Sequence, residues 1–123
     1  MHWKVFEIRE RCLNFAAAVS DFSLQLKKYH YCEITGQIIR SSISTSTNLA
    51  EVHSSQSKKE FIRIANIALR EISKTSYSFD LIGKLHNLSS HQLPKLKQES
   101  VELYKIVTTT IMNTKENVKK KKQ

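Results

Sequence analysis

Five histidines and two cysteines are the side chains of this chain best suited to bind a metal or to take part in catalysis. The histidines are His2, His30, His53, His86 and His91. No two of them share the i, i+4 spacing of metal ligands on one helical face, and none forms a Glu-x-x-His motif. We interpret Cys12 and Cys32, which lack metal-site spacing, as a buried small hydrophobic residue and a loop thiol rather than as a disulfide. The sequence therefore predicts no catalytic site, no metal and no cofactor.

A run of short hydroxyl side chains is the second group with possible chemistry. It comprises Ser41, Ser42, Ser44, Thr45, Ser46 and Thr47. The hydroxyls could line a phosphate site, or they could bond back to the preceding helical turn and let a neighbouring helix approach closely. We favour the second interpretation. Asn48 and Glu51 follow one turn apart, and we interpret them as a structural polar pair inside the fold rather than as catalytic groups.

A row of polar side chains at helical spacing, four of them cationic, is the strongest chemical signal in the chain. Its members are Lys59, Arg63, Asn66, Arg70, Lys74 and Tyr77. Steps of three and four residues place them on one face of a helix, and no acidic residue interrupts the row. The formal net charge is +9, and removing the four lysines at 119–122 still leaves 9 − 4 = +5. The row is either an ordinary solvated face or a phosphate-binding one, and the net charge makes polyanions the expected partners.

Four segments with apolar residues at helical spacing must position these side chains. We expect helices over residues 3–27, 34–53, 58–86 and 93–117. Ser57-x-x-Glu60 has the spacing of a capping box, which predicts that the third helix begins at Lys58. With two Gly and one Pro, the chain has few tight turns. The prediction is an all-α fold: an antiparallel up-down four-helix bundle over residues 1–118, followed by a disordered basic tail at 119–123.

The apolar stripe of the third helix is unusually wide. Ile62 and Leu69 widen it on one side, and Ile67 widens it on the other. A helix at the surface of one bundle needs an apolar arc of only about 100°. We therefore predict that these three residues form a subunit interface of a homo-oligomer.

The location of the protein is constrained mainly by what its sequence lacks. No apolar run approaches the roughly 20 residues that span a bilayer, and the N-terminus does not resemble a signal peptide. Unpaired cysteines suit a reducing cytoplasm, which is the expected location. Membrane-surface binding through the lysine tail is the least favoured alternative, because no lipidation signal adjoins it.

Short motifs over residues 37–71 resemble one bacterial protein family. They are Gln37-Ile38-x-Arg40, Ser44, Asn48-Leu49-Ala50-Glu51, Ser57-Lys58-Lys59-Glu60-Phe61 and Ile67-Ala68-Leu69. The family is that of the four-helix-bundle 23S ribosomal RNA intervening-sequence proteins, which includes relatives of the accessory variability determinant protein of diversity-generating retroelements. The chain departs from the pattern at Ile39, Thr45 and Val52, where the family usually has arginine, an apolar residue and glycine.

The resemblance implies a ring-like homopentamer with no enzymatic activity of its own. For the retroelement branch it also implies a nucleic-acid-binding assembly that associates with a reverse transcriptase. We expect the ligand to be RNA or an RNA/DNA hybrid. The phosphate contacts would come from Arg40, Lys59, Arg63, Arg70, Lys74, Lys119, Lys120, Lys121 and Lys122. The alternative is a protein-interaction scaffold of the ribosomal branch, whose basic face meets an acidic partner and has no direct nucleic-acid role.

Overall fold

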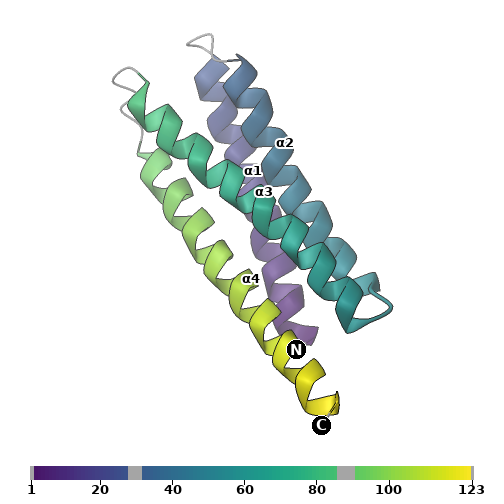
Figure 1. Cartoon of the computed structure of the whole chain (residues 1–123). Coiled ribbons are helices and arrows are strands. Elements are labelled where there is room, and N and C mark those ends of the chain that lie inside the picture. The colour runs from purple at the N-terminus through teal and green to yellow at the C-terminus, as the bar shows by residue number, and fades with distance from the viewer. Residues whose placement is uncertain (1, 28–31, 86–90, 123) are drawn as a thin grey trace.

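Four helices and one short 3-10 turn make up the described part of the chain (Figure 1). The structure, a computed structural model, describes residues 2–27, 32–85 and 91–122. Its elements are α1 (His2–Lys27), α2 (Cys32–Glu51), η1 (Val52–Ser54), α3 (Lys58–Lys84) and α4 (Gln92–Lys122). Because these ranges contain no strand, the all-α prediction is confirmed. None of the helices in these ranges has an apolar stretch long enough to cross a membrane.

The start of α3 follows from its capping residues. Ser57 has an extended backbone, and its Oγ accepts a hydrogen bond from the Glu60 amide at 3.1 Å. The Glu60 carboxylate accepts from the Gln56 amide at 2.9 Å, one residue earlier than a capping box requires. The predicted helix start is therefore confirmed, and the turn before it is tied to the first helical turn.

The ends of the last two helices differ from the prediction. α3 ends at Lys84 rather than at residue 86, and Leu85 is already extended; most of the expected turn at 87–91 lies outside the described residues. α4 continues to Lys122, so residues 119–122, expected to be disordered, form its last helical turn. Lysine is a good helix former, and cations near a helix C-terminus are favoured by the helix dipole. The side chains of these four lysines lie outside the described part of the chain.

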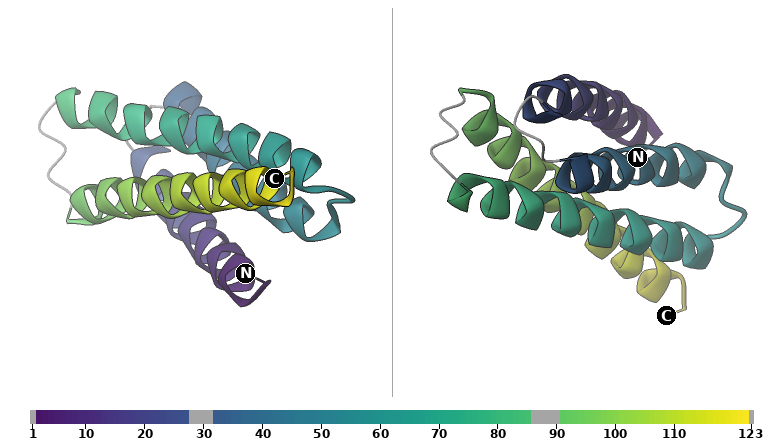
Figure 2. Two further views of the ribbon diagram at one scale, coloured as in Figure 1. Left: turned by 60° about the horizontal axis from the view of Figure 1, so that its bottom comes forward. Right: turned by 90° about the horizontal axis from the view of Figure 1, so that it is seen from above.

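One hydrophobic core is shared by all four helices. Each helix packs against the one before it, and α1 also meets α4 along a less closely packed seam (Figure 2). The ring of Phe79 lies between those of Phe15 and Phe22, with centroid separations of 6.3 and 6.4 Å and edge-to-face geometry. Such pairs contribute about 0.5–1.5 kcal/mol each beyond burial alone. The aromatic cluster thus joins α1 to α3 through the middle of the core.

The wide apolar stripe of α3 is explained by its place between two neighbours. α3 packs against both α2 and α4, and Ile62, Leu69 and Ile67 are all half-buried within the chain. Ile62 and Leu69 lie fourteen and seven residues before Ser76, which contacts α4, so they occupy that flank. The width of the stripe therefore does not by itself require a second subunit. An interface role for the three residues stays a prediction.

Candidate nucleic-acid interface

The predicted basic row lies on the outer face of α3. Lys59, Arg63 and Arg70 are exposed, and Tyr77, with 73% of its surface accessible, continues the row toward the helix C-terminus. Among the described residues, none of these three cations takes part in an ion pair. Their charges are therefore not offset by a nearby carboxylate, and an anionic ligand could approach them directly.

Lys74 differs from the other cations of the row. Its Nζ donates to the Glu71 carboxylate at 3.0 Å, one helical turn away. No acidic residue belongs to the row, yet Glu71 lies at its edge and pairs with Lys74. Lys74 is therefore the weakest of the four predicted phosphate contacts on α3.

Arg40 lies on a different helix from the row. It is an exposed residue of α2, and its side chain folds back along the helix over Gly36. A Cβ at position 36 would lie only 3.1 Å from the Arg40 Nη1 atom, so the absence of a side chain there makes room for the guanidinium. The role of Arg40 in binding stays a prediction.

The hydroxyl groups of α2 are structural. Ser41, Ser42 and Thr45 are buried and donate to backbone carbonyls one turn earlier. Ser41 Oγ also lies 2.6 Å from Thr75 Oγ1 of α3, which fixes the two helices at close range. Buried hydroxyls that bond to the backbone cannot reach a phosphate, so these three residues do not support a phosphate site. They support the interpretation that the short side chains let α2 and α3 pack closely.

Asn48 and Glu51 do not form the expected internal pair. The half-buried Asn48 amide donates to the Ser44 carbonyl at 2.8 Å and to Ser44 Oγ at 3.2 Å. Glu51, at the end of α2, is exposed. Asn48 is thus a local structural group. The prediction that Glu51 lies in the interior was wrong, because Glu51 is the last residue of α2 and its side chain is exposed to solvent.

A groove between α3 and α4 adjoins the basic row. Its volume is about 360 Å³, and both Tyr77 and Tyr104 line it. In the groove, Lys97 Nζ of α4 donates to Ser76 Oγ at 2.8 Å and to Asp80 Oδ2 at 2.8 Å. Tyr77 belongs to the row predicted from the sequence, whereas Tyr104 was not predicted as part of the site. The available signal was that Tyr104 is an aromatic residue outside the apolar stripe of its helix.

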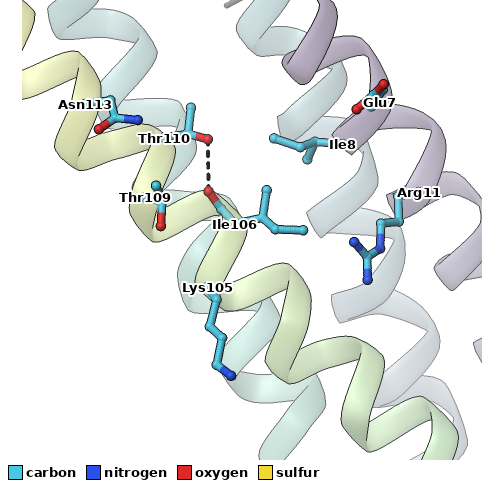
Figure 3. Close-up of a pocket in the computed structure, with 8 residues that line it drawn as sticks. All are labelled: Glu7, Ile8, Arg11, Lys105, Ile106, Thr109, Thr110 and Asn113. Carbon is cyan, nitrogen blue, oxygen red and sulfur yellow. Dashed lines mark hydrogen bonds between the residues drawn. The ribbon is translucent and has the colours of Figure 1, made fainter.

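A larger cavity, of about 420 Å³, lies along the seam between α1 and α4. Figure 3 shows Ile8 of α1 and Ile106 of α4 directed toward the space between the two helices, with Arg11 and Lys105 nearby. At this seam Arg11 donates twice to the Glu99 carboxylate, at 2.7 Å for both bonds. Glu99 raises the pKa of Arg11 through this hydrogen bond, against the opposing effect of burial. The Arg11–Glu99 ion pair therefore links α1 to α4 and has a structural role.

The described residues offer no centre for metal or thiol chemistry. They contain no cluster of three histidine, cysteine or acidic side chains that could hold an ion. Cys12 is fully buried, as predicted, and desolvation is the main cause that raises the pKa of its thiol to about 12. A thiol with such a pKa is not a nucleophile near neutral pH. The side chain of Cys32 lies outside the described part of the chain.

Comparisons with known proteins agree with this architecture. A sequence model of the family described as 23S rRNA-intervening sequence protein matches residues 4–109. A crystal structure from Bacteroides thetaiotaomicron, described as a protein with unknown function from the S23 ribosomal protein family, is 25% identical. The alignment covers 89% of this chain and 98% of that one, with a TM-score of 0.82. No curated protein matches the sequence significantly.

Proposed function

The chain belongs to the 23S rRNA-intervening sequence protein family, and from this premise we propose that it is a non-catalytic protein that binds RNA. The observation that carries the proposal is the exposed row on α3, in which Lys59, Arg63 and Arg70 lack carboxylate partners among the described residues. Phosphate contacts of this kind position a nucleic acid without reading its sequence. The proposed location is the cytoplasm.

Salt dependence tests this proposal. Each phosphate contact releases counterions, so log K should fall linearly with log salt concentration, with a slope of about −0.7 to −0.9 per contact. Arg63→Glu and Arg70→Glu should each weaken RNA binding and make the slope shallower. Arg9→Glu, an equal charge change at an exposed position of α1, is the matched control and should have a much smaller effect. Affinity that does not change between low and physiological salt would exclude this mechanism.

We also propose an antiparallel up-down bundle that associates with copies of itself, as the homopentamer implied by the family resemblance requires. Support comes from large apolar side chains that α1 and α2 expose: Leu13, Leu24 and Ile43. Leu13 and Leu24 are eleven residues apart, which places them on one side of α1. Leu13 lines a groove with Ser46 and Ala50 of α2, so the side of α1 that exposes Leu13 and Leu24 borders α2. Exposed apolar patches of this kind typically mark protein interfaces.

The alternative function is a scaffold whose basic face meets an acidic protein. The charge-reversed variants separate the two functions. Loss of a protein complex with RNA binding intact favours the scaffold, and the reverse result favours the RNA-binding protein. A reverse transcriptase is the candidate protein partner, because the retroelement branch of the family implies one. Co-purification of the chain with such an enzyme encoded beside it tests that assignment.

A further inference from the structure

The groove between α3 and α4 presents two aromatic side chains to solvent. Tyr77 is 73% exposed and Tyr104 is 42% exposed, and both line the same groove. Tyrosine rings are large apolar surfaces that are enriched where proteins bind partners. Two of them at one groove on the outer surface indicate a ligand with a flat apolar face.

The groove and the basic row are continuous through Tyr77. Tyr77 lies seven residues after Arg70, which places both on the same face of α3. A helix rises about 1.5 Å per residue, so the two side chains start about 10 Å apart along the axis. A ligand whose phosphates lie along the row can therefore reach the groove with a neighbouring part of the same molecule.

Apart from Lys105, which also lines the groove and pairs with Glu102 at 3.9 Å, the polar groups inside the groove are unsuited to a phosphate. The Asp80 carboxylate, more than half exposed, would repel an anion, and the Lys97 ammonium already bonds to Asp80 and Ser76. The same carboxylate can accept a hydrogen bond from an amino group of a neutral base. The Ser73 and Ser76 hydroxyls, which also line the groove, add further donors and acceptors. These contacts match a nucleobase.

Because the cations lie along the row on α3 and the aromatic rings lie in the groove, we propose that the groove receives an unpaired base of single-stranded RNA, which stacks on Tyr77 and Tyr104. The inference rests on the proposed RNA-binding function and specifies its substrate class. In a duplex the base faces are stacked inside and cannot reach a side chain, whereas unpaired bases can be splayed out onto aromatic rings. Phosphates follow the cations of α3, while bases enter the groove.

Fluorescence anisotropy with a labelled single-stranded RNA and a duplex of the same length tests the proposal. Tyr77→Ala and Tyr104→Ala should each weaken single-strand binding roughly five- to a hundredfold, the range of one lost base–aromatic stack. Duplex binding should change little. Tyr77→Phe should bind like the unchanged protein because the ring is retained. The slope of affinity against salt should also be unchanged, since no phosphate contact is removed.

Met112→Ala is the matched control, because Met112 is an exposed large side chain of α4 that does not line the groove. Tyrosine variants that bind single strands normally, while Arg63→Glu and Arg70→Glu do not, overturn the stacking inference and leave the proposed function intact. Equal weakening of single-strand and duplex binding overturns it as well. Charge-reversed variants that bind normally overturn the proposed function itself.

Discussion

At the scale of single residues, burial determines what Cys12 can do. Its side chain is fully enclosed, and desolvation, together with the charge of Glu99, raises the pKa of its thiol to about 12 against the opposing effect of Arg11. A thiol in the unfolded chain titrates near pH 9. The folded state therefore holds its proton more tightly, and this contribution to stability is present below pH 9 and is lost as pH rises toward 12.

Cys12 should accordingly resist alkylation in the folded protein. At pH 8 a thiol of pKa about 12 is ionised to a fraction of only about 10⁻⁴, and the thiolate is the reactive form. We expect iodoacetamide to label the peptide containing Cys12 rapidly in urea and slowly in buffer. Mass spectrometry of separated peptides distinguishes Cys12 from Cys32. Rapid labelling of Cys12 under native conditions would show that the part of the core around Cys12 opens readily to solvent.

At the scale of elements, Ser57 specifies where α3 begins. Replacing it by alanine removes the acceptor for the Glu60 amide. We expect Ser57→Ala to lower the free energy of unfolding by about 1 kcal/mol, the typical effect of losing an N-cap. Urea denaturation measures the change. Ser54→Ala, an exposed serine of η1, is the control and should change the stability by less than half as much; equal losses would contradict a capping role.

The helices themselves could be predicted, because apolar spacing and a capping box are local signals. The capping serine fixed the start of α3, and the apolar stripe of α1 matches its buried face. Helix ends were less predictable: Glu51 was placed inside the fold, although α2 ends there at the surface. A helix end depends on tertiary contacts that one-dimensional spacing does not contain.

The candidate site also shows that sequence spacing predicts features within one helix better than features that depend on tertiary contacts. The basic row of α3 was predicted from spacing alone, because all its members belong to one helix. The groove was missed, because Tyr104 reaches it from α4 and only the packing of α3 against α4 brings the two tyrosines together. The wide apolar stripe of α3 faces two neighbours within the chain, α2 and α4, and spacing alone cannot show whether it also contacts a second subunit.

At the scale of the whole molecule, α3 lies between α2 and α4, which flank it on different sides (Figure 1). The exposed cations and tyrosines of α3 and α4, with Leu81 and Met112, belong to one part of the surface, and Leu13, Leu24 and Ile43 belong to α1 and α2. This arrangement would let the proposed self-association and the proposed RNA binding use different surfaces. An assembly built through α1 and α2 would leave the basic rows of all its subunits accessible to one RNA.

Leu24→Glu should therefore reduce the size of the assembly. A charge placed at an exposed apolar contact must be desolvated on association, which disfavours the interface. Light scattering should show a shift toward the 14.2 kDa monomer. Met112→Glu is a matched control, since Leu24 and Met112 are each 62% exposed but belong to different helices, α1 and α4. If Met112→Glu dissociates the assembly and Leu24→Glu does not, the interface lies on α4.

The seam between α1 and α4 has a consequence for the order in which the molecule assembles. The Arg11–Glu99 contact joins residues 88 positions apart, whereas most of the other helix contacts join helices that are neighbours in the chain. Closing so long a loop costs more entropy than pairing adjacent helices, so this contact should form after the folding transition state.

Refolding and unfolding rates of Glu99→Gln check this order. The half-exposed ion pair contributes up to about 1 kcal/mol, so its loss should raise the unfolding rate as much as about fivefold and leave the folding rate unchanged. If Glu99→Gln slowed folding, the α1–α4 seam would instead belong to the folding nucleus. If the expected order holds, the lifetime of the folded state is set where the first helix meets the last, even though most of the core is built elsewhere.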